Sequence, residues 1–285
     1  MSKKRIPILW ALICLLLFSV SSAGAYNYPF DDRYVATVLS TPAEYAEVLP
    51  AEVPVKIETI NMFPERKVPG ILWNLEEMRY SYIKQDGPAP LIFLIAGTGA
   101  SFNSAKMQIM QKAFYRAGYH VVSITSPTHP NFIVAASTSG VPGHLEEDSA
   151  DLYRVMQSIW QKLEKKIEVT DFNLTGYSLG AAQSAFIAKI DEQEKAFNFR
   201  KVLLINPPVS LYNSVLILDE MLEHNIPGGA DNFSAFYNRL IAAFSDTYAH
   251  GQDVKFNDQF LYKTYEHRKP TSDDPLEALI GLDFR

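Results

Sequence analysis

The segment Gly176-Tyr177-Ser178-Leu179-Gly180 carries the clearest chemical signal in the sequence, a serine with a glycine two positions to either side. In a G-x-S-x-G pattern, a sharp turn between a strand and a helix exposes the serine hydroxyl as a nucleophile. Side chains at the two outer positions would collide where the strand and the helix converge. The pattern therefore predicts a catalytic nucleophile at Ser178, with Gly176 and Gly180 as structural residues of the turn.

Attack by a serine on a carbonyl carbon creates an oxyanion, which needs hydrogen-bond donors that are already in place. We expect one donor to be the backbone N–H of Leu179. The second should come from the loop 96–101, which follows a predicted strand, and we assign it to the backbone N–H of Thr98. The alternative for Gly97-Thr98-Gly99 is a plain tight turn without a catalytic part.

The elements that must position these residues follow from the hydrophobic pattern. Apolar runs typical of strands buried on both faces alternate with helical patterns in the middle of the chain. The predicted strands cover residues 91–95, 120–124, 172–175 and 201–205, and the predicted helices cover 104–117, 145–166 and 179–197. This alternation predicts an α/β fold with a mostly parallel sheet and helices on both faces. Residues 55–62 and 78–83 predict an antiparallel pair of edge strands, and residues 126–143 a loop.

With the turn at Ser178 and the loop from Ala96 to Gly99, the chain from Leu91 to Asn206 resembles the α/β-hydrolase superfamily. The resemblance implies a serine hydrolase of the esterase or lipase type that works through an acyl-enzyme. It also implies an acid and then a histidine after later strands. The chain departs from the family pattern at Ala96, where many members have histidine.

Neither triad partner is found downstream of Ser178. Asn206 follows the last predicted strand, but it is an amide, and His224, His250 and His267 fall at predicted helix ends, where a histidine is typically a solvated cap. Residues 207–285 show helical spacing and no strand candidate. Two explanations stay open: the sequence is the N-terminal portion of a longer protein, which we favour, or the protein is a non-catalytic binder of the same fold.

Two further residues are candidates for contact with a substrate. His129 follows the predicted strand 120–124, so it should share the ligand-binding edge of the sheet with Ser178, and Tyr177 precedes the nucleophile directly. We expect a helical lid over residues 209–285, whose apolar faces either line a pocket for a small or lipid-like ester or pack only on each other. The sequence makes no prediction of oligomeric state.

Composition excludes several other classes of function. The net charge is −6, and Lys3-Lys4-Arg5 is the longest basic run, so no nucleic-acid footprint exists. Nucleotide binding at Gly97-Thr98-Gly99 lacks a third glycine, where Phe102 stands instead. The sequence has no metal-ligand pattern such as H-E-x-x-H, so we predict neither a metal nor a cofactor.

The N-terminus has the pattern of a secretion signal. Positive residues precede the apolar run 6–20, and Ala23-Gly24-Ala25 predicts cleavage between Ala25 and Tyr26. A membrane anchor is the alternative, but the run is shorter than the roughly 20 residues that a span needs. The only cysteine, Cys14, would leave with the signal. We therefore expect a secreted or periplasmic protein without a stable membrane anchor.

The predicted organisation has four parts. A signal peptide covers residues 1–25 and an N-terminal arm covers 26–55, with a helix start at Thr41-Pro42. The α/β core covers 56–208, and the helical lid covers 209–285.

Overall fold

The computed structural model describes residues 29–39, 41–42, 44–250 and 276–283. The predicted signal peptide and its cleavage site, with Cys14, lie outside these residues. The chain divides into two compact units. We call residues 47–217 the sheet unit and residues 1–46 with 218–285 the helical unit, and describe each by itself.

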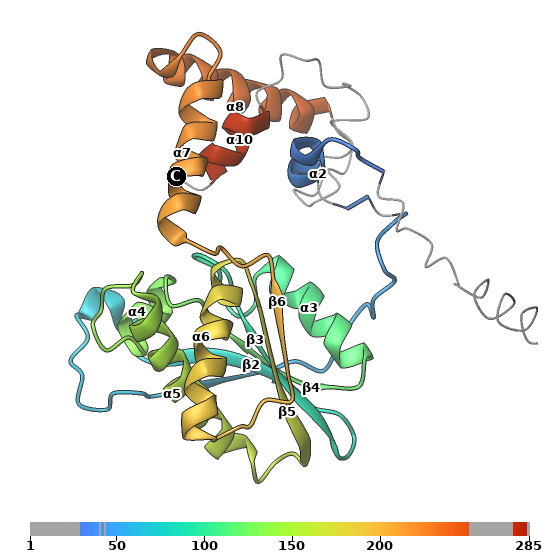
Figure 1. The fold of residues 1–285 in the computed structure, drawn as a ribbon, viewed down its shortest axis with the longest axis vertical. Coiled ribbons are helices and arrows are strands. Elements are labelled where there is room, and N and C mark those ends of the chain that lie inside the picture. The colour runs from blue at the N-terminus through green and yellow to red at the C-terminus, as the bar shows by residue number, and fades with distance from the viewer. Residues whose placement is uncertain (1–28, 40, 43, 251–275, 284–285) are drawn as a thin grey trace, which may run out of the picture. The chain divides into compact units, whose positions relative to one another are not determined.

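The sheet unit is built on a six-stranded sheet with the strand order β1-β2-β4-β3-β5-β6 (Figure 1). The strands are β1 (Lys56–Ile60), β2 (Met78–Ile83), β3 (Ala89–Ile95), β4 (His120–Ile124), β5 (Val169–Tyr177) and β6 (Lys201–Ile205). β2 pairs antiparallel with both β1 and β4, whereas β4, β3, β5 and β6 run parallel. The predicted α/β class with a mostly parallel sheet is confirmed.

The register brings the ends of the four parallel strands to one edge of the sheet. Ile95 at the end of β3 lies opposite Ile124 of β4 on one side and Gly176 of β5 on the other. Tyr177 lies opposite Ile205, the last residue of β6. The segments that follow β3, β4, β5 and β6 therefore all start at this carboxyl edge, where open α/β sheets bind ligands.

Helices cover both faces of the sheet (Figure 1). The helices of this unit are α3 (Ala105–Arg116), α4 (Pro130–Ala135), α5 (Leu145–Leu163) and α6 (Leu179–Glu194), with a 3₁₀ segment η1 (Gly70–Leu75). α5 begins with Glu146, Glu147 and Asp148, whose charges suit a helix N-terminus. After Leu179, the first turn of α6 consists of Gly180, Ala181 and Ala182, small residues that allow a close approach to the sheet.

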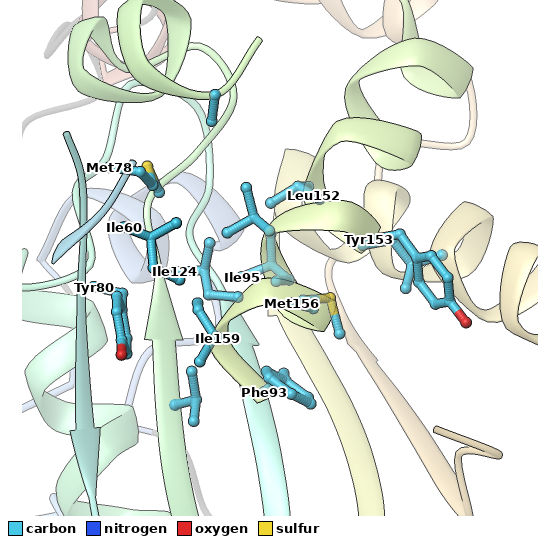
Figure 2. Close-up of a cluster of buried hydrophobic side chains, with 14 of the residues drawn as sticks. Ile60, Met78, Tyr80, Phe93, Ile95, Ile124, Leu152, Tyr153, Met156 and Ile159 are labelled. Atoms are coloured by element: carbon cyan, nitrogen blue, oxygen red, sulfur yellow. The ribbon is translucent and has the colours of Figure 1, made fainter. Parts of the chain in front are cut away.

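The side chains of β3 alternate between two hydrophobic clusters. Leu91, Phe93 and Ile95 pack with residues of α5, including Leu152, Met156 and Ile159 (Figure 2). Ile92 and Leu94 pack instead with Met107 and Met110 of α3. Both faces of β3 are buried, which explains why its sequence is a solid apolar run rather than an alternating one.

Three sequence expectations need correction in the structure. β2 is not an edge strand, because it pairs on both sides and five of its six residues are buried. The expected loop 126–143 contains the short helix α4. At the expected helix start Thr41-Pro42, the described residues 41–42 and 44–46 include no helix, and the N–H groups of Tyr45 and Ala46 both donate to the Pro42 oxygen. The helix of the arm is α2 (Arg33–Leu39), capped by the Asp32 carboxylate.

The helical unit has a small core of its own. The boundary between the units falls within α7 (Leu211–Asn225), which is followed by η2 (Ala230–Asn232), α8 (Phe233–His250) and α10 (Leu276–Asp283). The core consists of Leu222, Ile226, Phe236 and Ala278. Gly281 lets α10 approach α7, because a Cβ there would lie 2.6 Å from the Leu222 backbone nitrogen. The apolar side of α10 is thus packed on α7.

The described part of the region 209–285 is helical over 211–225, 230–250 and 276–283, as its spacing predicts, but its role as a lid stays a prediction. In the described part of the chain, no helix combines the length and the apolar character needed to cross a membrane.

Candidate active site

Ser178 lies on the turn between β5 and α6 in a backbone conformation that few non-glycine residues adopt. Its φ is 53° and its ψ is −126°, and it forms the N-cap of α6. The neighbouring backbone holds it there: its N–H donates to the Ile205 carbonyl oxygen at 2.9 Å, and its carbonyl oxygen accepts from Ala181 N–H at 2.9 Å. Such strain typically costs about 1–3 kcal/mol and clusters at functional sites. We call residues 176–180 the elbow.

Both glycines of the elbow lie where no side chain fits. A Cβ at Gly176 would lie 2.3 Å from the Gly180 carbonyl oxygen. A Cβ at Gly180 would lie 2.4 Å from the Ile95 oxygen and 2.5 Å from the Ala96 oxygen, so the first turn of α6 touches the end of β3. The two glycines therefore serve separate contacts, one within the elbow and one between the elbow and β3.

The loop after β3 lies against the elbow. A Cβ on Gly97 would lie 2.6 Å from the Tyr177 ring and 3.1 Å from the Tyr177 carbonyl oxygen. The half-buried ring of Tyr177 also has the Lys106 ammonium 4.9 Å above its centre. Tyr177 thus helps to hold the loop that follows β3, a role in addition to its predicted contact with substrate.

Three backbone N–H groups of the elbow and of the loop after β3 have no acceptor within the described residues: those of Leu179, Gly97 and Thr98. Leu179 is 5% exposed and Gly97 is buried, while Thr98 is exposed. Buried N–H groups without a partner are rare in proteins. Leu179 and Thr98 are the two donors that the sequence predicts for an oxyanion, and Gly97 is a third free donor that the sequence does not predict.

Hydrogen bonds join the loop after β3 to the segment after β4. The Thr128 hydroxyl accepts from Gly99 N–H at 2.7 Å, and the Thr125 hydroxyl accepts from Phe102 N–H at 3.1 Å. No local sequence motif predicts a role for Thr125 or Thr128. The available signal was a run of hydroxyl residues directly after a buried parallel strand.

His129 is the N-cap of α4, and its Nδ1 accepts a hydrogen bond from Asn131 N–H at 3.1 Å. Burial lowers the pKa of the imidazole, which favours the neutral ring. With Nδ1 as the acceptor, the ring proton is on Nε2. A triad base needs the opposite tautomer, with Nε2 free to take a proton. In this arrangement His129 could donate a hydrogen bond to a substrate but could not act as the base.

No acid or base contacts the Ser178 hydroxyl: within the described residues it makes no hydrogen bond. Asn206 follows β6 with φ 48°, and beyond it the described residues hold helices and no strand. His224 lies in the last turn of α7 and His250 is the last residue of α8. His267 lies outside the described residues. The structure thus places Ser178 next to the free N–H of Leu179 on an elbow that contacts the loop after β3, and leaves the rest of a triad unassigned.

The buried carboxylates of the sheet unit have structural partners. Asp191 accepts from the Tyr153 hydroxyl at 2.7 Å and from two backbone N–H groups of the segment before β6. Asp151 accepts from Thr138 and Arg154. Asp148 accepts from Gly143 N–H at 2.8 Å, and burial raises the pKa of its carboxyl. No group of three or more potential metal ligands is found among the residues that the structure describes.

No family model matches the chain, and neither does any curated protein. Among solved structures, it is similar to brefeldin A esterase, titled a bacterial homologue of human hormone-sensitive lipase, with 14% identity over 62% of this chain and 48% of the other and a TM-score of 0.41. It is also similar to a Pyrobaculum calidifontis esterase, with 18% identity over 66% of this chain and 57% of the other and a TM-score of 0.39. A third similar structure is Est1E from Butyrivibrio proteoclasticus, with 13% identity over 52% of this chain and 51% of the other and a TM-score of 0.35. The chain spans about half the length of these proteins.

Proposed function

We propose that this protein is a serine hydrolase that cleaves small or lipid-like carboxylic esters through an acyl-enzyme. The observation that carries the proposal is the strained backbone of Ser178 on a strand-to-helix turn, directly before the free N–H of Leu179. Strained backbone conformations of this kind persist only where the surrounding structure enforces them, and they cluster at functional sites. Export by the N-terminal signal would place the activity outside the cytoplasm.

In the proposed reaction, the Ser178 hydroxyl oxygen attacks the carbonyl carbon of the ester, and its proton passes to a base. The carbonyl oxygen gains negative charge and accepts hydrogen bonds from the N–H groups of Leu179 and Thr98. The intermediate collapses by breaking the bond to the alcohol, which leaves with the proton. Water then attacks the acyl-enzyme and releases the carboxylic acid and Ser178.

A second function is binding without catalysis. It is favoured by the absence of a histidine or carboxylate contact to the Ser178 hydroxyl within the described residues. A serine without a base is a weak nucleophile. A protein of this kind would bind an ester at the same edge of the sheet without turning it over.

Labelling with a fluorophosphonate separates the two functions, because the probe reacts with activated serines. We expect the full chain to be labelled, Ser178→Ala to lose the label, and Ser234→Ala, a change at an exposed serine of α8, to keep it. An unlabelled wild-type protein would overturn the hydrolase and leave the binder. If Ser178→Ala is still labelled, another residue is the nucleophile.

A further inference from the structure

Thr128 occupies a place in the site that the proposed reaction does not yet use. β3 and β4 are parallel neighbours, and Ala96 N–H continues their pairing by donating to the Ile124 oxygen at 3.1 Å. The two following segments then stay joined. Ser126 N–H donates to the Ala100 oxygen at 3.0 Å, and Phe102 N–H donates to the Thr125 hydroxyl. The segment after β4 is thus a backing for the loop 97–102.

Within this backing, Thr128 supplies the contact nearest to the free donors. Its hydroxyl oxygen accepts from Gly99 N–H at 2.7 Å, the shortest hydrogen bond between the two segments. The buried Ser126 hydroxyl lies 3.0 Å from the same oxygen. A threonine hydroxyl has two acceptor positions and one donor, so both contacts can be made at once. The contact with Ser126 thereby orients the Thr128 hydroxyl that accepts the hydrogen bond from Gly99 N–H.

This contact decides which N–H groups of the loop are available. Three successive residues, 97 to 99, could in principle offer donors to an oxyanion. The N–H of Gly99 is taken by Thr128, and its φ of 66° turns the chain away from the run of β3. The N–H groups of Gly97 and Thr98 have no acceptor within the described residues. The loop is therefore packed against Tyr177 at Gly97 and bound to Thr128 at Gly99, and Thr98 lies between these two fixed residues.

We infer that Thr128 is a positioning residue for oxyanion stabilisation: by binding Gly99 N–H, its hydroxyl fixes the loop that presents the free donors to the serine. This inference rests on the proposed function. Oxyanion donors act because they are oriented before the charge develops, and small displacements at such a site are costly in rate. Thr128 itself touches no reacting atom and acts through the loop.

The test compares Thr128→Val, which keeps the shape and loses the acceptor, with Thr128→Ser, which restores a hydroxyl. Thr170→Val is the matched control, because Thr170 is exposed near the start of β5 and its hydroxyl binds only the neighbouring Asp171 side chain. With p-nitrophenyl acetate, we expect Thr128→Val to lower kcat about 10- to 100-fold with little change in KM. Thr128→Ser should recover most of the loss, and Thr170→Val should match wild type.

Two further measurements separate positioning from a general structural role. The affinity for a trifluoromethyl ketone, which forms a tetrahedral oxyanion on the serine, should fall by the same factor as kcat. Backbone hydrogen exchange in residues 97–102 should quicken in Thr128→Val even where its melting temperature equals that of wild type. If the valine variant folds poorly, Thr128→Ala, which also lacks the hydroxyl, replaces it in both measurements, with Thr128→Ser as the variant in which exchange stays slow.

A Thr128→Val protein with wild-type kcat, or with unchanged exchange at residues 97–102, would overturn the inference while the hydrolase stands. A fall in kcat together with an equal rise in KM, or no recovery in Thr128→Ser, would assign Thr128 a merely structural role. A wild-type protein that neither turns over the ester nor reacts with a fluorophosphonate would overturn the proposed function, and the inference with it.

Discussion

At the scale of single residues, the elbow is a set of close contacts around one strained backbone. Ser178 can hold φ 53° only because its N–H and carbonyl groups are both bound and its flanking glycines leave room for the turn. A residue in this conformation tends to relax unless its surroundings prevent it. The contacts of Gly176 and Gly180 are therefore as important for a reactive serine as the hydroxyl itself.

Gly180→Ala tests this directly. The added Cβ meets backbone oxygens at 2.4 and 2.5 Å, which no side-chain rotation can relieve. We expect a loss of about 1–3 kcal/mol in the free energy of unfolding, in line with overpacking elsewhere, and loss of fluorophosphonate labelling. Chemical denaturation and the labelling assay measure the two effects.

Gly70→Ala is the matched control for Gly180→Ala, because nothing lies within 4 Å of its Cβ position and its φ is ordinary. It should stay within about 0.5 kcal/mol of wild type. A Gly180→Ala protein that is equally stable and equally reactive would mean that α6 does not press on β3 as described.

At the scale of elements, α4 depends on a histidine at its N-cap. Nδ1 of His129 accepts from Asn131 N–H, which only the neutral ring can do. Burial lowers the pKa of His129 below its ordinary value of 6.5, so the folded state binds this proton less well than the unfolded state. The stability that this residue contributes is then present above pH 6.5 and is lost as the pH falls through the lowered pKa.

His129→Asn should remove this pH dependence, because an asparagine oxygen caps a helix without titrating in this range. We expect the melting temperature of wild type, relative to the variant, to fall as the pH is lowered from 7 to 5. Differential scanning fluorimetry over this range measures the difference, and His120 titrates equally in both proteins. A constant difference would show that the cap does not depend on the charge of His129.

The elements themselves show where sequence patterns suffice. The bounds of β2, β4 and β6 agree with the predicted strands because β-branched and apolar runs end sharply at polar or turn residues. α4 was missed because its six residues, which begin with Pro130, are too few to show a helical period. The interior position of β2 was missed because its pairing with β4 depends on a partner about forty residues away.

The candidate site divides in the same way. The elbow was predictable because its residues are neighbours in sequence and its glycines have a local steric cause. The hydrogen bond between Thr128 and Gly99 joins residues 29 positions apart, so no local pattern reports it. The tautomer of His129 likewise depends on the cap geometry of α4. No acid or base could be predicted, and the described residues supply none in contact with the serine.

At the scale of the whole molecule, the proposed export can be checked on the protein itself. The chain should be recovered outside the cytoplasm with Tyr26 as its first residue, by mass spectrometry of the N-terminal peptide. Ala23→Glu should block cleavage, because signal peptidase requires a small residue three positions before the cut. An uncleaved wild-type chain in the membrane fraction would instead support an N-terminal anchor.

The hydrogen bond from Ser178 N–H to the Ile205 oxygen ties the elbow to β6, and β6 is the outermost strand of the described sheet, with Leu203 51% exposed. Edge strands open locally at a lower free energy than the global unfolding of a domain. A molecule whose outer strand has frayed would keep its core and most of its helices, but the backbone of Ser178 would no longer be held in its strained conformation. The hydrolase activity can therefore be lost while the protein stays folded. We expect mild heating to abolish the activity at a temperature at which circular dichroism still shows the folded helices.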